Sequence, residues 1–256
     1  MSEPLIHADI AKAHTLPSRF YTDEDTFRNL ISGMQDCWYF GAHSSQFAEH
    51  NVIPLTDIEK MLGEALILAN SDRIRCLSNV CTHRGMLVAT EPCNSNTLQC
   101  RYHGRTFGID GCFKNMPDFQ DVEDFPSASD DLANFPVTDW KGLQLVGGDL
   151  YLEEAITELE SRLGWIDVES FQHDPSRYRS YEIKANWALY VDNYLEGFHI
   201  PFVHGDLHDV LDKDEYRTEL FEGGVLQIGI AKEGEPHFEP PKNSFFSIFN
   251  SLHNLL

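Results

Sequence analysis

Two short stretches, CTHRG beginning at Cys81 and CRYHG beginning at Cys100, decide how the rest of the chain is interpreted. The first pairs Cys81 with His83, and the second pairs Cys100 with His103. Each stretch ends in a glycine, which permits a tight backbone turn. Sixteen residues separate His83 from Cys100. Two loops therefore each offer one thiolate and one imidazole to a shared metal site.

This ligand pattern is typical of a 2Fe-2S cluster of the Rieske type, in which two cysteines bind one iron and two histidines bind the other. A neutral imidazole donates less negative charge to iron than a thiolate does, so mixed ligation raises the reduction potential. We therefore predict that Cys81, His83, Cys100 and His103 hold a Rieske 2Fe-2S cluster. The alternative is a structural zinc ion, but zinc ligands more usually group as Cys-x2-Cys with His-x3-5-His.

Length and composition exclude several classes of protein. The chain has 256 residues, 42% of them hydrophobic, which is enough for one large or two modest domains with a core. Its formal charge of -22 argues against partners such as nucleic acid and anionic membrane surfaces. The N-terminus lacks the basic and apolar regions of a signal peptide, and no apolar run is long enough to span a membrane. We expect a cytoplasmic protein.

The distribution of apolar residues predicts an α+β chain. Residues 1–36 should form an N-terminal helical segment that packs on the last domain, with an amphipathic helix after Thr22. Residues 37–152 read as an antiparallel all-β domain that contains both ligand loops, since short strand-like runs are broken by Gly, Asn, Asp and Pro. Expected strands include 64–69, 73–78, 143–146 and 150–152. Residues 153–256 should begin with a helix at 153–163 and continue with a capped helix and strands at 216–222 and 224–231.

A second group of candidate ligands lies on the helix that Asn186 is expected to cap. Its apolar residues recur at helical spacing and predict a buried face: Trp187, Tyr190, Val191, Tyr194, Leu195 and Phe198. Glu196 and His199 fall on a polar stripe of the same helix, and His204 follows Pro201. A proline bends or ends a helix, so it could bring His204 toward an ion bound by His199. Taken alone, the same pattern also fits a solvated helix face.

Residues 186–204, which read NWALYVDNYLEGFHIPFVH, resemble the mononuclear iron segment of the Rieske non-haem iron oxygenase alpha subunits, the ring-hydroxylating type. The two Cys/His loops resemble the Rieske domain of the same family. The segment around Glu196 is more similar to members that act on the quaternary amines choline and carnitine than to members that act on aromatic rings. The resemblance implies an all-β Rieske domain followed by a catalytic domain of helices and antiparallel sheet.

The resemblance also implies the chemistry. His199 and His204 would bind a mononuclear Fe(II), and Glu196 would link this iron to the Rieske cluster of a neighbouring subunit in a homotrimer. The activity would be O2-dependent mono- or dioxygenation of a small organic substrate. Electrons would come from NAD(P)H through a flavin/iron-sulfur reductase or a ferredoxin.

One departure from the family concerns the third ligand of the iron. In the family, a carboxylate from a helix far downstream completes a 2-His-1-carboxylate site. Here Leu256 is 52 residues after His204, and no acid in that interval matches the family's position. We therefore expect an incomplete catalytic domain, truncated at its C-terminus and inactive in this form, unless Asp206 or Asp209 substitutes. The alternative function is electron transfer by a Rieske ferredoxin-like protein without catalysis of its own.

Overall fold

The structure is a computed structural model that describes residues 6–7, 9–235, 237–238 and 248–249. Contacts divide the chain into two compact units. The β unit comprises Met34–Tyr178, and the hairpin unit comprises Met1–Gly33 together with Arg179–Leu255. Among the described residues, no helix is both long and apolar enough to cross a membrane.

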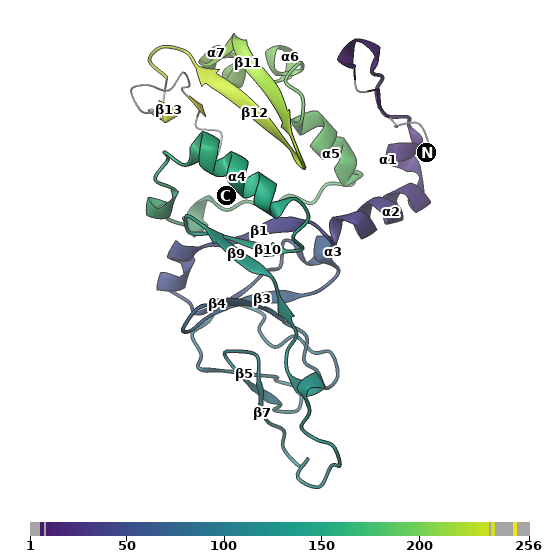
Figure 1. Ribbon diagram of the computed structural model, residues 1–256, viewed down its shortest axis with the longest axis vertical. Coiled ribbons are helices and arrows are strands. Elements are labelled where there is room, and N and C mark those ends of the chain that lie inside the picture. Colours follow the sequence, from purple (N-terminus) through teal and green to yellow (C-terminus); the bar gives the residue numbers. More distant parts are fainter. Residues whose placement is uncertain (1–5, 8, 236, 239–247, 250–256) are drawn as a thin grey trace. The chain divides into compact units, whose positions relative to one another are not determined.

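Three antiparallel sheets build the β unit, and the four-stranded sheet lies between the other two (Figure 1). The strand order of this central sheet is β2-β3-β4-β8, formed by Val52–Pro54, Leu66–Asn70, Ile74–Ser78 and Asn134–Phe135. One outer sheet has the order β1-β10-β9, formed by Trp38–His43, Leu143–Gly147 and Val137–Trp140. The other has the order β5-β6-β7, formed by Thr97–Gln99, Thr106–Gly108 and Phe113–Asn115.

Strand β3 explains why the central sheet is covered on both faces. Its first four residues are all buried, so the strand reads as a continuous apolar run instead of an alternating one. Successive side chains point to opposite faces. Leu66 and Leu68 belong to a core shared with Ala42 of β1, whereas Ile67 and Ala69 belong to a second core. This second core contains Leu98, Phe107, Cys81 and Cys100, so both predicted cysteine ligands rest on the central sheet.

Helix α4, Leu152–Leu163, belongs to the β unit because side chains tie it to the end of the β9–β10 hairpin. Trp140 Nε1 donates a hydrogen bond to Glu160 Oε2 at 3.0 Å, and Lys141 Nζ donates one to the carbonyl of Gly164. The segment that follows also stays on the β unit, since buried His43 donates through Nε2 to the carbonyl of Val168 at 3.1 Å. The remaining elements of the unit are short: η2 Ser44–Ala48, α3 Glu59–Leu62, η3 Ala128–Asp130, η4 Val168–Ser170 and η5 Pro175–Arg177.

The hairpin unit consists of short helices and an antiparallel pair, β11 and β12, that turns at Gly223 with φ +81°. Its elements are η1 Ile10–Lys12, α1 Arg19–Thr22, α2 Glu24–Met34, α5 Trp187–Tyr194, α6 Ile200–Val203, α7 Gly205–Val210, β11 Leu211–Phe221, β12 Gly224–Ala231, β13 His237–Phe238 and β14 Ile248–Phe249. Helix α1 is held to α5 by two hydrogen bonds: Tyr21 donates to Asp192 at 2.9 Å, and Asn186 donates to the carbonyl of Tyr21 at 3.1 Å.

The α+β class predicted from the sequence is confirmed, as are the strands near 64–69, 73–78 and 143–146 and the helix near 153–163. The strand expected at 150–152 is wrong. Gly147, with φ +108°, ends β10, and Tyr151 has φ +56° and precedes the first turn of α4. A left-handed backbone at Tyr151 cannot continue a strand. The domain boundaries expected after residues 36 and 152 stay a prediction.

Candidate metal centres

The first ligand loop is closed by its own backbone. The amide of Cys81 donates to the carbonyl of Met86 at 2.9 Å, and the amide of Gly85 donates to the carbonyl of Cys81 at 3.0 Å. Gly85 has φ +71°, a conformation that side-chain-bearing residues rarely adopt. The glycine therefore allows the chain to turn back over the cysteine, and His83 lies within the turn.

The second loop repeats this arrangement. The amide of Cys100 donates to the carbonyl of Arg105 at 2.8 Å, and the amide of Gly104 donates to the carbonyl of Cys100 at 3.0 Å. Gly104 has φ +72°. Both loops therefore have the same two backbone hydrogen bonds at the same spacing from the cysteine. The histidine is the third residue of the first loop and the fourth residue of the second. The two loops therefore close in the same way but carry their histidine at different positions.

The four predicted cluster ligands come together. Cys81 and Cys100 are each 2% exposed and lie in the same apolar core. The rings of His83 and His103 meet edge to face with centroids 4.7 Å apart. His83 is half-buried and His103 is exposed. The site thus has a buried thiol side and an imidazole side that faces the surface.

The protonation of these groups also fits a metal centre. Burial raises the pKa of the Cys81 thiol, and the neighbouring Cys100 adds to the shift, so the metal-free loop holds a thiol that gives up its proton on binding iron. Burial, His103 and the nearby arginines lower the pKa of His83, which favours the neutral imidazole that coordinates metals. The donor set of two cysteines and two histidines therefore fits a Rieske cluster.

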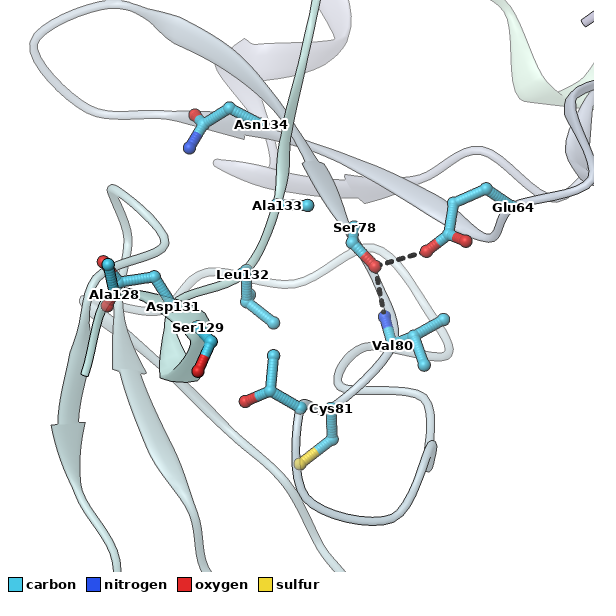
Figure 2. A pocket seen from close by; sticks show the side chains of 11 residues that line it. Glu64, Ser78, Val80, Cys81, Ala128, Ser129, Asp131, Leu132, Ala133 and Asn134 are labelled. Carbon is cyan, nitrogen blue, oxygen red and sulfur yellow. Dashed lines mark hydrogen bonds between the residues drawn. The ribbon is translucent and has the colours of Figure 1, made fainter. Parts of the chain in front are cut away.

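A shallow cavity of about 550 Å³ borders the first loop (Figure 2). Cys81 and Thr82 contribute to its lining, as do Ala128, Ser129 and the segment 131–134. At its edge, Ser78 donates to Glu64 Oε1 at 2.5 Å and accepts from the amide of Val80 at 3.1 Å. These bonds fix the chain immediately before the ligand loop.

The second candidate site lies between α5 and α6, where the structure differs from the predicted helix. Helix α5 starts as expected, because Asn186 Oδ1 accepts from the amide of Ala188 at 3.0 Å, but it ends at Tyr194. Glu196 therefore lies in a non-helical connection and not on a helical stripe. Pro201 occupies the first turn of α6, where its missing N–H is not needed, so it starts a helix instead of breaking one.

This connection nevertheless brings the predicted residues together. The rings of His199 and His204 meet edge to face with centroids 5.1 Å apart. The carboxylate of Glu196 accepts a hydrogen bond from Nδ1 of His199 through Oε1 and one from the amide of Phe198 through Oε2. Partial burial opposes the charge on Glu196, but the bonds from His199 and Phe198 lower its pKa overall, so the carboxylate is ionised.

The apolar face predicted for this region is exposed, which corrects the expectation of burial. Of the predicted residues, Tyr190 is 68% and Phe198 is 86% exposed, and Val191, Tyr194 and Leu195 are exposed as well. Trp187 is half-buried. Helical spacing identifies residues that share a face, but it does not reveal whether another element covers that face. Within the described residues, the elements near α5 and α6 leave these rings open.

No group of three His, Cys, Asp or Glu side chains converges on a single point in the part of the chain that the structure describes. Neither Asp206 nor Asp209 therefore joins the two histidines as a third ligand here. A Rieske cluster does not require such a group, since each of its irons takes only two protein ligands.

Three residues near these sites have no recognisable local sequence signal. The buried Arg105 forms an ion pair with the half-buried Asp130 beside the cluster loops, and Tyr216 packs against the backbone of Gly197. An arginine directly after CRYHG looks like a surface residue in the sequence, and only its 3% exposure reveals its role. The contact of Tyr216 with Gly197 depends on tertiary packing that no local pattern encodes.

Comparison with protein families identifies both parts of the chain. Residues 37–126 match the Rieske [2Fe-2S] domain, and residues 172–248 match the ring hydroxylating alpha subunit (catalytic domain). The chain belongs to the Rieske oxygenase alpha subunits. The Rieske domain of this family implies a 2Fe-2S cluster, and the catalytic domain implies a mononuclear iron.

Named relatives of this alpha-subunit homologue act on quaternary amines. It is 28% identical to the carnitine monooxygenase oxygenase subunit of Escherichia coli (strain K12) over 243 residues, which cover 91% of this chain and 63% of the relative. It is 27% identical to the chloroplastic choline monooxygenase of Beta vulgaris over 229 residues, covering 84% and 50% of the two chains. The chain thus spans less than two thirds of the length of these relatives.

Solved structures show the same fold. A quaternary ammonium Rieske monooxygenase aligns with a TM-score of 0.74 at 25% identity, covering 90% of this chain and 62% of the other. Naphthalene 1,2-dioxygenase from Rhodococcus sp. aligns with a TM-score of 0.68 at 22% identity, covering 94% and 59% of the two chains.

Proposed function

We propose that this alpha-subunit homologue takes part in O2-dependent hydroxylation of a small organic substrate, with electrons that pass from a Rieske cluster to a mononuclear iron. The observation that carries the proposal is the pair of loops with matching backbone closure, which gathers two buried thiols and two imidazoles. When bound, the cluster supplies electrons one at a time and the ferrous site activates O2. A separate reductase or ferredoxin, drawing on NAD(P)H, would reduce the cluster.

In this proposal, Cys81, His83, Cys100 and His103 would hold the cluster, the thiols on its buried side and the imidazoles toward the surface. The apolar core around the thiols excludes water from the sulfur side. The imidazoles lie toward the surface, because His83 is half-buried and His103 is exposed. An electron would therefore enter or leave through the histidine side.

His199 and His204 hold the mononuclear iron in this proposal. Glu196 accepts the hydrogen bond from Nδ1–H of His199, which fixes the orientation of the ring and would leave Nε2 free to bind the iron. We propose that the same carboxylate also accepts a hydrogen bond from the cluster histidine of a neighbouring subunit in a homotrimer. That second role would make Glu196 the electron bridge between subunits.

For the substrate, we propose a quaternary amine such as choline or carnitine. The named relatives support this class. So do the exposed rings of Phe198 and Phe202, which flank His199 in the sequence, because the face of an aromatic ring attracts a cation.

Two imidazoles without an anionic ligand bind Fe(II) weakly, and the described residues supply no such ligand. We therefore propose that the 256-residue chain by itself does not turn over substrate. The assay supplies a competent reductase, NAD(P)H, excess Fe(II) and a panel of choline, carnitine and aromatic acids. Hydroxylated product formed in step with NAD(P)H consumption would show that a nearby acid such as Asp206 or Asp209 completes the site.

Iron counting separates this proposal from the alternative of a ferredoxin-like electron carrier. Anaerobic reconstitution with excess Fe(II) should yield a 2Fe-2S cluster plus a more loosely held third iron. The double variant His199→Ala/His204→Ala should lose only the third iron, and Cys100→Ser should lose only the cluster. If the parent and the double variant bind equal iron, the electron-carrier function is the better description. If the reduced parent lacks the low average g value expected of mixed Cys/His ligation, the cluster assignment is wrong.

A further inference from the structure

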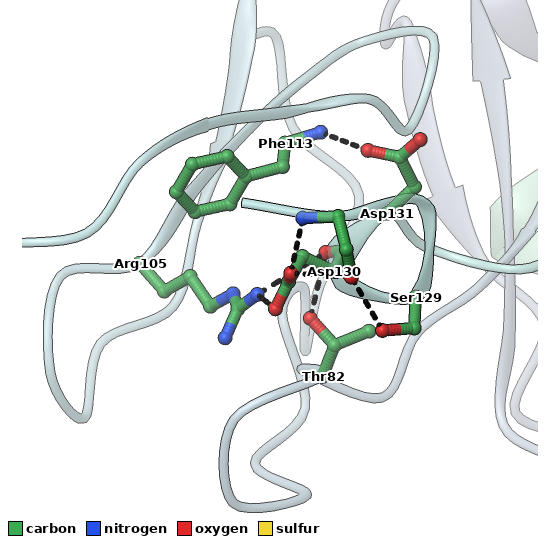
Figure 3. Close-up of polar contacts among 7 residues, drawn as sticks. Thr82, Arg105, Phe113, Ser129, Asp130 and Asp131 are labelled. Carbon is green, nitrogen blue, oxygen red and sulfur yellow. Dashed lines mark hydrogen bonds and ion pairs between the residues drawn. The ribbon is translucent and has the colours of Figure 1, made fainter. Parts of the chain in front are cut away.

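Asp130 contacts both loops that carry the cluster ligands (Figure 3). Its carbonyl accepts a hydrogen bond from Oγ1 of Thr82 at 2.8 Å, and Thr82 is the residue between Cys81 and His83. Its carboxylate accepts from Nη2 of Arg105 through Oδ1, and the same nitrogen is 3.4 Å from its carbonyl oxygen. A single residue outside the loops thus bridges the two halves of the site.

Arg105 connects Asp130 to the second loop. Its carbonyl accepts the hydrogen bond from the amide of Cys100 at 2.8 Å, while its side chain reaches Asp130. The backbone of Arg105 therefore closes the loop, and its guanidinium ties the closed loop to the segment around Asp130.

The position of Arg105 is energetically demanding, because its side chain is only 3% exposed. Its Nε–H is buried without an acceptor among the described residues. The guanidinium carbon lies 5.0 Å from the ring centre of Phe113 and 5.5 Å from that of Phe125, and these ring faces attract the cation. A buried cation still needs an anion, and Asp130 supplies it.

Asp130 is itself held firmly. Its Oδ2 accepts from the amide of Ser127 at 2.7 Å and from the Ser127 hydroxyl at 3.1 Å. The adjacent Asp131 accepts through Oδ1 from the amide of Phe113 at 2.6 Å. The segment around Asp130 is therefore anchored by contacts outside the cluster loops, and it can hold both loops in a fixed position.

We propose that Asp130 is a positioning residue for the Rieske centre, which fixes the spacing of the two ligand loops and neutralises the buried charge of Arg105 beside them. This inference rests on the proposed cluster. It assigns two separable effects to Asp130: retention of the cluster depends on the bonds to both loops, and the reduction potential depends on the balance of charge.

The experiment compares variants of the full chain loaded anaerobically with the cluster. Thr82→Val removes one bond and no charge, so the cluster should be lost several-fold faster while the potential stays at the parent value. Asp130→Asn should also speed cluster loss, but it should raise the potential, because the uncompensated cation of Arg105 favours the more negative reduced cluster. Adding Arg105→Gln to Asp130→Asn should return the potential toward the parent value without restoring retention. Asp121→Asn, at an exposed position, is the matched control.

Cluster loss is followed by visible absorbance and the potential by redox titration, and circular dichroism checks the fold of each variant. If Asp130→Asn matches Asp121→Asn in both measurements, the inference is overturned. If Asp130→Asn does not fold, Thr82→Val decides, and unchanged cluster retention in that variant overturns the positioning role. A parent chain that binds no 2Fe-2S cluster contradicts the proposed function itself. A parent chain that binds the cluster, together with variants that behave like the parent, contradicts only the role of Asp130.

Discussion

Glu196 and His199 are joined by a hydrogen bond between the carboxylate Oε1 and the imidazole Nδ1, in the connection between α5 and α6. A carboxylate in this position orients a metal-binding imidazole without contacting the ion itself. Glu196 is thus assigned a supporting role, whereas His199 and His204 are the proposed iron ligands. Substitution of Glu196 tests this difference.

We predict that Glu196→Gln weakens metal binding without abolishing it. Glutamine keeps a hydrogen-bond acceptor for His199 but removes the charge, and loss of such a supporting group costs roughly 10- to 100-fold in metal affinity. Titration with Co(II), followed by its visible absorption bands, measures the affinity. Glu222→Gln, in the exposed β11–β12 turn, should have no effect. Complete loss of binding in Glu196→Gln would make Glu196 a ligand.

We predict that His83→Cys retains two irons and lowers the reduction potential. A thiolate stabilises the oxidised cluster more than an imidazole does, so the potential should fall by roughly 100 mV or more. Redox titration and EPR of the reduced protein measure the change. His173→Cys adds a thiol at an exposed position of the same unit and serves as the control. An unchanged or higher potential would exclude His83 as a ligand.

The sequence indicates that the two cluster loops converge, because their signal is local. Each ligand pair and its glycine lie within five residues, and the backbone bonds that close each loop reach only one residue further. The prediction that the helix continues through Phe198 is wrong, because α5 ends at Tyr194. Periodicity extended it past Tyr194, whereas Gly197 and the Glu196–Phe198 hydrogen bond favour a non-helical connection. The pairing of Arg105 with Asp130 joins residues 25 apart, so only the folded chain brings them together.

We predict that the stabilising effect of Asp130 disappears in acid. The Ser127 amide and the Arg105 guanidinium hold the pKa of Asp130 below its ordinary value despite partial burial. Because the folded pKa is lower than the unfolded one, the carboxylate contributes stability above the ordinary carboxyl pKa and loses it as the pH falls through the folded pKa. Asp130→Asn should therefore destabilise the metal-free chain by about 1–3 kcal/mol at pH 7. Thermal unfolding from pH 7 to pH 3 should show the gap in Tm between parent and variant narrowing, and a constant gap would contradict this assignment.

The last prediction concerns Gly197, which lies directly against the ring of Tyr216. A Cβ at Gly197 would overlap Cε1 of Tyr216 and lie 2.9 Å from both Cδ1 and Cζ, too close for any side chain. The ring cannot move freely, because its hydroxyl donates to Oε1 of Gln227 at 2.7 Å, and Gln227 donates in turn to the carbonyl of Tyr194. This chain of contacts fastens the end of α5 to the β11–β12 hairpin.

Gly197→Ala should therefore destabilise the hairpin unit by about 1–3 kcal/mol, the usual effect of overpacking. Gly205→Ala is the matched control, since nothing lies within 4 Å of its added Cβ, and alanine at a compatible backbone position should stabilise by roughly 0.4–1 kcal/mol. Amide hydrogen exchange of residues 187–194 measures the local stability, with residues 66–78 of the β unit as an internal reference. Adding Tyr216→Ala to Gly197→Ala should give a combined effect smaller than the sum, because the clash no longer exists once the ring is removed. Strictly additive effects, or a Gly197→Ala variant as stable as Gly205→Ala, would show that the ring does not constrain this connection.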